Sequence, residues 1–298
     1  MEQIYVTLLM PRLPPELECL IFEYVATRWP TEVPKLLLVA SRVLEWLESY
    51  LYTVLRLDCS DPHTDKVLAA LTAKSASFRS SAVRHLLLRS RSFQSAEINT
   101  KPTVDILRAC PGVTTLNLTG DNVGPHLLPI LAGMRLERLS MEFRDLFGVS
   151  RPVDVWHPLF RAVTHLEIMD FNFPSNSVEA LCVLPALTHL TFRQAPPPRV
   201  LRPLLESSPR LEVVLIFPIL YYLDTNAEAR RYVSAANLEG PDSWAVVIAA
   251  RRPYDDEDWE LGARGGEDIW MRAERFIAQK RSGEIQSGNY LLPEARTR

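Results

Sequence analysis

The sequence predicts an α/β repeat protein, in which a short helical module precedes a solenoid of parallel strands and outer helices. Three observations support this fold class. An apolar pattern of helical period opens the chain, six apolar triplets recur through its middle, and prolines stand just before three of those triplets. The expected divisions are residues 11–57 for the module, 58–250 for the solenoid, and 251–298 for an acidic loop, a C-terminal capping helix and a tail.

The bulk composition argues against several classes of partner. A formal net charge of -3 without a clustered basic surface predicts no nucleic-acid partner. No apolar run approaches the roughly 20 residues that cross a bilayer, so we expect no membrane partner. The apolar stretch from Ile4 to Met10 is too short for a signal core. Four scattered cysteines predict reduced thiols, and a location in the cytoplasm or nucleus is expected.

Residues 11–57 are predicted to form two helices. The first begins near Pro14 and Pro15, because a proline in the first turn leaves no donor unpaired. Its inward stripe is expected to be Leu17, Leu20, Ile21, Tyr24 and Val25. The second helix, from about residue 35 to 50, is expected to turn Leu36, Val39, Ala40, Val43, Leu44, Leu47 and Leu51 inward. Its further apolar residues pack either on the rest of the chain or on a partner.

These residues carry a family resemblance. Leu-Pro-x-Glu-Leu, then Ile-Phe, a proline-broken gap and a leucine-rich segment with a tryptophan together resemble the F-box. The segment is especially similar to the variant in short F-box-like proteins of mushroom-forming fungi, as is the C-terminal stretch from Asp268 to Ile285. The resemblance implies docking to a Skp1-type subunit of a cullin ubiquitin ligase through Leu13, Pro14, Leu17, Ile21, Phe22, Leu37, Leu38, Val39 and Trp46. Phe22 and Leu37 are expected to be exposed anchors.

The middle of the chain repeats one short pattern. Six segments of the form apolar-x-x-apolar-x-apolar begin at Val83, Val113, Leu136, Val163, Leu187 and Leu211, so their starts lie 30, 23, 27, 24 and 24 residues apart. This period is that of leucine-rich repeats or slightly longer. Such triplets also arise by chance, and the prolines decide the matter. Pro111, Pro185 and Pro209 each follow a predicted helix and stand two residues before a triplet, where proline ends the helix.

A solenoid of this kind presents the alternate strand positions on its concave side. The polar candidates for binding an unknown protein target are Arg89, Asn117, Thr119, Glu142, Glu167, Thr191 and Arg193. In the end rows, Leu87 and Leu215 take the same position, which predicts that those rows are covered or capped. Residues 143–160, rich in aromatic side chains, are expected to form a longer loop that either packs on the solenoid edge or binds a partner.

The C-terminal part is predicted as a helix at 226–236, a strand at 244–250, and a last helix from Asp268 to Lys280. That last helix turns Ile269, Trp270, Ala273, Phe276 and Ile277 to one face and is expected to cap the open end of the solenoid. The acidic run from Asp255 to Asp258 is expected to be a solvated loop, since adjacent like charges need water. Metal binding by this run would need more widely spaced ligands.

Nothing in the sequence predicts an enzyme, a cofactor or a catalytic residue, because no hydrolase, zinc-protease or nucleotide-loop motif is present. His85, His165 and His189 share one repeat position. A row of this kind is either a tolerated position or a metal ladder or pH sensor, and the first interpretation is preferred. The sequence therefore predicts a non-enzymatic adaptor. The alternative is a repeat scaffold without a ligase link, in which the first helices only cap the solenoid.

Overall fold

The computed structural model describes residues 13–90, 100–121, 123–149, 151–171, 173, 175–217, 225–238, 245–249 and 256–293. The stretch from Ile4 to Met10, Asp255 and Trp244 lie outside the described residues. The chain divides into two compact units, Met1–Thr53 and Val54–Arg298, called here the N-terminal unit and the repeat unit. No described helix has the length and apolar character needed to cross a membrane.

The N-terminal unit is a small helical bundle. Its elements are α1 (Pro15–Arg28), η1 (Pro30–Glu32), α2 (Val33–Leu36) and α3 (Ser41–Tyr52). The predicted second helix is therefore broken at residues 37–40. Four buried residues form its core, with partly buried apolar side chains around them: Ala26, Val33, Val43 and Leu47, surrounded by Phe22, Leu36, Leu37, Ala40, Trp46 and Tyr50.

The face of α1 that was expected to point inward points outward. Leu17, Leu20, Ile21 and Tyr24 are 47–66% exposed, whereas Phe22 and Ala26 pack on the core. The ring centroids of Phe22 and Trp46 lie 6.4 Å apart within this packing. In the second helical segment, Val43 and Leu47 are buried as predicted, but Val39, Leu44 and Leu51 are exposed.

The repeat unit contains a nine-stranded parallel sheet in which the strands of the described residues follow their sequence order. The strands are β1 (Val54–Asp58), β2 (His85–Ser90), β3 (Thr115–Gly120), β4 (Arg138–Met141), β5 (His165–Ile168), β6 (His189–Phe192), β7 (Val213–Ile216), β8 (Val246–Ala249) and β9 (Leu291–Leu292). The six predicted triplets lie on β2 to β7 as consecutive parallel neighbours. The predicted α/β repeat solenoid is thus confirmed, and its sheet begins at Val54 rather than after residue 57.

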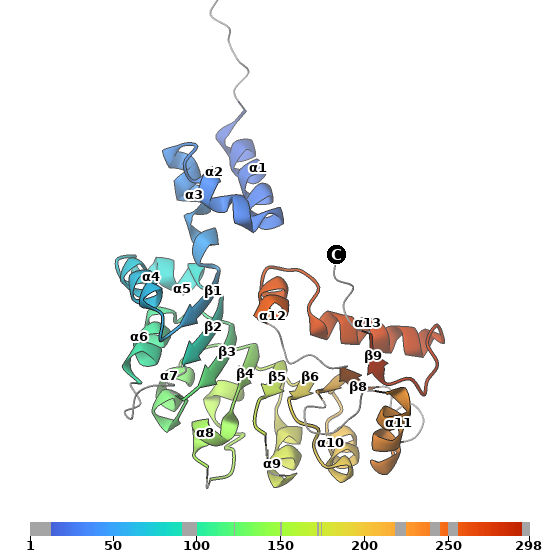
Figure 1. The fold of residues 1–298 in the computed structure, drawn as a ribbon. Helices are drawn as coiled ribbons and strands as arrows, with labels where there is room; N and C mark the ends of the chain where they lie inside the picture. The colour runs from blue at the N-terminus through green and yellow to red at the C-terminus, as the bar shows by residue number, and fades with distance from the viewer. Residues whose placement is uncertain are drawn as a thin grey trace, which may run out of the picture. The chain divides into compact units, whose positions relative to one another are not determined.

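Outer helices cover one side of this sheet (Figure 1). They are α4 (Pro62–Thr72), α5 (Ala76–Ala82), α6 (Lys101–Ala109), η2 (Pro125–Leu127), α7 (Leu128–Leu131), α8 (Phe143–Phe147), η3 (Pro158–Phe160), α9 (Ser175–Ala180), η4 (Leu181–Val183), η5 (Pro198–Val200), α10 (Leu201–Ser207) and α11 (Asn226–Ala235). The three helices that precede Pro111, Pro185 and Pro209 are present as predicted.

The core lies between the sheet and these helices. Strand register stacks the central apolar residue of each triplet in one continuous row, and Leu116, Leu166 and Leu190 are buried as predicted. The aromatic stretch at 143–160 contains α8 and η3 rather than only a loop. Its side chains Phe143, Phe147 and Phe160 are buried on one another, whereas Trp156 is 78% exposed.

The C-terminal segment lies on the opposite side of the sheet from the outer helices. It consists of α12 (Asp256–Ala263) and α13 (Ile269–Ser282), followed by the return to β9 (Figure 1). Both helices pack on alternate strand residues of that side, called here the inner face, which is the predicted concave side. The last helix therefore covers the inner face of the sheet, and the expectation that it caps the open end of the solenoid was wrong.

Candidate functional site: the inner face of the sheet

Three of the seven predicted concave-face residues are closed off from solvent. Register places Asn117, Glu167 and Thr191 side by side with Ser140 across β3 to β6, and all four side chains are buried. Arg89, Thr119, Glu142 and Arg193 are partly exposed. The expectation of an open polar binding surface is therefore corrected, because the chain's own C-terminal segment lies across this face.

Helix α12 is held on the first two strands by charge. Arg89 and Arg56 both form ion pairs with Asp256, and Arg56 Nη1 also lies 2.9 Å from Glu260 Oε2. Trp259 adds apolar contact with Val54 and Leu87 and is almost fully buried. The acidic run was expected to be a solvated loop, but its described part begins a helix that neutralises strand arginines.

Helix α13 is held on the last strands by apolar contact. Its five predicted apolar residues are all buried, against Val213 and Leu215 on β7 and against Val247 on β8. The prediction that the rows of Leu87 and Leu215 are covered is confirmed, since Trp259 packs on the first and α13 on the second. The last strands of the inner face are therefore apolar, its middle is polar, and its first two strands combine apolar residues with paired arginines.

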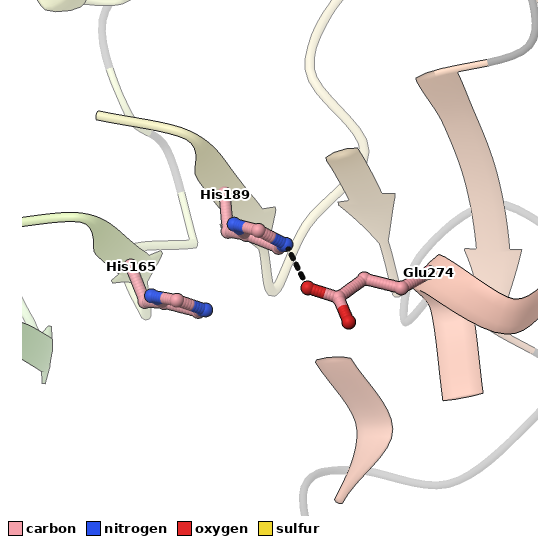
Figure 2. Close-up of side chains that lie close together, drawn as sticks. All are labelled: His165, His189 and Glu274. Atoms are coloured by element: carbon pink, nitrogen blue, oxygen red, sulfur yellow. Dashed lines mark hydrogen bonds and ion pairs between the residues drawn. The ribbon is translucent and has the colours of Figure 1, made fainter. Parts of the chain in front are cut away.

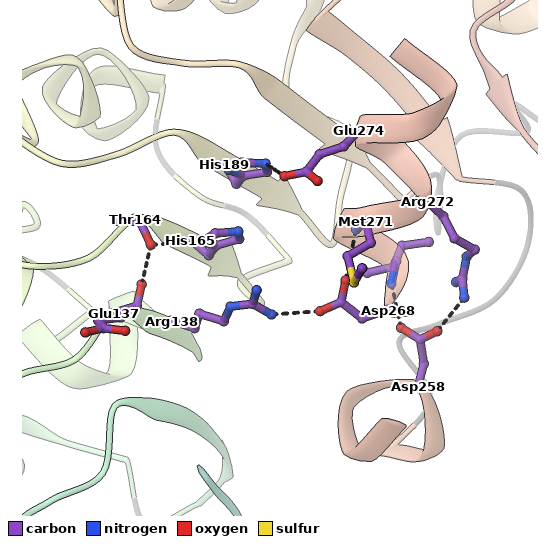
Figure 3. Close-up of polar contacts among 11 residues, drawn as sticks. Glu137, Arg138, Thr164, His165, His189, Asp258, Asp268, Met271, Arg272 and Glu274 are labelled. Atoms are coloured by element: carbon purple, nitrogen blue, oxygen red, sulfur yellow. Dashed lines mark hydrogen bonds and ion pairs between the residues drawn. The ribbon is translucent and has the colours of Figure 1, made fainter. Parts of the chain in front are cut away.

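A polar network fixes where α13 begins (Figure 3). Asp268 caps the helix by accepting a hydrogen bond from the N–H of Met271, and its other oxygen lies 2.7 Å from Nη1 of Arg138 on β4. Asp258 on α12 accepts from the N–H of Ile269 and from Arg272 at 2.7 Å. A carboxylate at a helix N-terminus is favoured by the unpaired N–H groups and by the helix dipole. These contacts join both covering helices to the sheet.

The histidine row lies beneath Trp270. The rings of His165 and His189 are stacked, with centroids 4.1 Å apart, and the Trp270 ring meets both edge-on at 5.3 and 5.5 Å. Nε2 of His189 lies 2.9 Å from Oε1 of Glu274 on α13. His85, at the same repeat position, is separated from this pair by the rows of Thr115 and Arg138.

A cavity of about 310 Å³ remains between the middle of the sheet and the covering segment. Its lining is strongly mixed in charge, with Arg138, Glu167 and Asp268 beside two histidines and two tryptophans: His85, His165, Trp259 and Trp270. Burial and the nearby arginines lower the pKa of His85 to about 4, so that ring is neutral at pH 7.

Buried carboxylates in this region are partnered. Glu167 accepts a hydrogen bond from the Ser140 hydroxyl and pairs with Nε of Arg193 at 3.0 Å. Glu142, beyond the end of β4, differs in that its neighbouring charged groups are acidic. Burial and the neighbouring acidic groups, Asp145 first among them, raise the pKa of Glu142 to about 7.

The N-terminal unit presents a separate candidate surface. Of the residues implied by the F-box resemblance, Leu13, Leu17, Ile21, Leu38 and Val39 are exposed, and so is Pro14. Phe22, Leu37 and Trp46 instead pack against the unit's own core. The expectation that Phe22 and Leu37 are exposed anchors is therefore corrected.

Comparisons with known proteins identify no family for the chain. No protein-family model matches the chain, and no curated protein matches its sequence. Among solved structures, it is similar to the crystal structure of the leucine-rich repeat-containing protein LegL7 from Legionella pneumophila. The two share 15% sequence identity with a TM-score of 0.38, over 82% of this chain and 95% of that one. The repeat architecture rests on the strand order and register described above.

Sequence reasoning missed the groups that close the inner face, namely Asp256, Trp259, Asp268, Trp270 and Glu274 acting together. A signal for them was present in the charges. Arginine and histidine recur on the inner strand positions, and acidic residues with two tryptophans follow in the stretch from 255 to 274. Complementary charge between distant segments is a weak but usable indication of contact.

Proposed function

We propose that the chain is a protein-interaction adaptor that docks to a Skp1-type subunit of a cullin ubiquitin ligase through its N-terminal unit. The repeat unit would carry the second partner, a protein target. The observation that carries this proposal is the apolar stripe that α1 leaves exposed: Leu17, Leu20, Ile21 and Tyr24, each at least 47% exposed.

Exposing this stripe to water is energetically unfavourable for a small unit. Residues at positions i, i+3, i+4 and i+7 share one helix face, so the four side chains form a continuous strip. Monomeric proteins rarely keep such apolar patches exposed unless the patch meets a partner. Leu38, 87% exposed in the turn before α3, adds to the apolar surface of the same unit. The F-box resemblance supplies the class of partner.

The test is binding of the purified full chain to a purified Skp1-type protein, measured by calorimetry. Leu17→Glu and Ile21→Glu each place a charge in the stripe. We expect each to weaken binding by at least about 30-fold, which corresponds to the ~2 kcal/mol of an interface hot spot. Because both side chains are exposed, the melting temperature should stay close to that of the parent.

Val183→Glu is the matched control, since it adds the same charge at an exposed apolar residue of the repeat unit. It should leave the affinity unchanged. Phe22→Glu serves a different purpose, because burying an unpaired charge in the core of the N-terminal unit should unfold that unit. Absence of binding by the parent chain would leave only the repeat scaffold without a ligase link.

A further inference from the structure

Three side chains able to ligate a metal converge on the inner face from three different elements. His165 lies on β5, His189 on β6 and Glu274 on α13, and one ligand atom from each lies within 4.8 Å of the others (Figure 2). The two imidazole rings are nearly parallel, at 8°, and both point toward the helix that carries the carboxylate. Register stacks the two histidines as direct partners on neighbouring strands.

Each histidine is held by the threonine that precedes it. Oγ1 of Thr164 lies 2.9 Å from Nδ1 of His165, and Oγ1 of Thr188 lies 2.8 Å from Nδ1 of His189. When the threonine oxygen accepts the Nδ1 proton, Nε2 keeps a free lone pair. Metal-bound histidine has this arrangement, with its outer N–H held by a second group. The repeat supplies that arrangement twice.

The charges in this region favour a cation between the rings and the carboxylate. The Glu274 carboxylate faces the two stacked rings of His165 and His189 from α13. Protonating both would place like charges 4.1 Å apart between ring centroids. One divalent ion would balance Glu274 without that repulsion. Arg138, the next group in the row, is already paired with Asp268 at 2.7 Å.

We propose that Nε2 of His165, Nε2 of His189 and the Glu274 carboxylate bind a divalent transition-metal ion of the zinc class. Zinc takes imidazole and carboxylate ligands, and with three protein ligands it keeps one position for water. Glu274 is half exposed, so the site opens to solvent. Tetrahedral bonds of about 2.1 Å set ligand atoms about 3.4 Å apart. Binding therefore requires rotation of the exposed carboxylate and a tilt of the two nearly parallel rings, so that their in-plane lone pairs meet at the ion. The ion would fasten α13 to β5 and β6.

The experiment titrates Zn²⁺ into the metal-free full chain at neutral pH and follows heat and melting temperature. We expect one ion per chain, bound with micromolar or tighter affinity, and a melting temperature that rises with Zn²⁺. Glu274→Gln should weaken binding at least about tenfold and abolish most of the rise, because it removes the charged ligand. His165→Ala should act in the same direction. Thr164→Val should weaken binding about 10- to 100-fold by freeing the ring of His165.

His126→Ala is the matched control, because this histidine is exposed and outside the cluster. It should bind Zn²⁺ as the parent does. The exposed position of Glu274 makes its glutamine variant a safe test of the site, and circular dichroism would check that it folds. Absence of micromolar Zn²⁺ binding by the parent would overturn the proposal. Binding that Glu274→Gln and His165→Ala leave unchanged would also overturn it and would point to the cysteines.

Discussion

Phe276→Ala tests whether α13 is fastened to the inner face by apolar burial. The Phe276 side chain is 2% exposed and packs in the cluster that contains Leu215 and Val247. A buried aromatic residue removes about 150–250 Å² from water, which at about 25 cal/mol per Å² gives an upper value of about 4–6 kcal/mol. Alanine retains part of that area, and buried Phe→Ala changes typically cost 3–5 kcal/mol. We therefore expect Phe276→Ala to lower the free energy of unfolding by about 3–5 kcal/mol.

Hydrogen exchange measured by mass spectrometry shows which part of the chain is destabilised in the variant. In the variant, amides of residues 269–282 should exchange faster, while those of β3 to β5 should change much less, because α13 can leave the sheet without unfolding it. Met271→Ala is the matched control on the same helix. Because Met271 is 45% exposed, this change should alter the free energy of unfolding by less than about 0.5 kcal/mol. If Phe276→Ala lowers the free energy of unfolding by less than about 1 kcal/mol and leaves exchange at residues 269–282 unchanged, the placement of α13 on the inner face is refuted.

Two further outcomes are expected. Leu190→Ala should lower the free energy of unfolding by about 2–5 kcal/mol in denaturant titration, because Leu190 is fully buried in the repeat core, and a change below about 0.5 kcal/mol would contradict the register. Burial lowers the pKa of Lys280 to about 8, below the value of about 10.4 expected in the unfolded chain, so the unfolded state binds more protons between these values. Stability should therefore rise by about 1–3 kcal/mol as pH increases from 8 to 10.4, and Lys280→Met should remove that rise; an identical rise in the variant would contradict the assignment.

Local signals were sufficient to predict the repeats. Each triplet places its last two apolar residues at the strand spacing, and before three of the triplets a proline two residues earlier ends the preceding helix. Both effects act over fewer than about ten residues, so the sequence reveals them without knowledge of the fold. The strands β2 to β7 lie where these triplets predicted them. Strand β1 was assigned to the helical module because its apolar pattern directly follows that of α3.

The covering segment was harder to predict because its contacts are distant in sequence. Arg56 and Asp256 are 200 residues apart, and Arg138 and Asp268 are 130 apart. The apolar stripe of α13 was recognised correctly, but periodicity shows only that a face is buried and not which surface it meets. An end cap and a cover over the inner face bury the same stripe. The apolar residues Leu87 and Leu215, at positions otherwise polar, indicated a cover, and the complementary charges of the two segments were a weaker indication.

The prediction that the apolar stripe of α1 points inward was wrong for a related reason. A helical apolar pattern is usually assigned to the inside, yet α1 has apolar residues on two faces. Phe22 and Ala26 are the residues by which α1 contacts the small core, and the longer stripe of this helix lies outside it. In a unit of about 50 residues the core is too small to bury every apolar side chain. For such units, surplus apolar residues indicate a docking surface more than a misassigned core.

The covered inner face limits where a target can bind on the repeat unit. Four large apolar side chains of α13, Ile269, Trp270, Phe276 and Ile277, are buried against the sheet. At about 1.5–3 kcal/mol each, their burial is worth about 6–12 kcal/mol. Micromolar to nanomolar binding supplies only about 8–12 kcal/mol, so displacing α13 would consume most of a partner's affinity. On the proposed adaptor function, a target is therefore expected to bind with α13 in place.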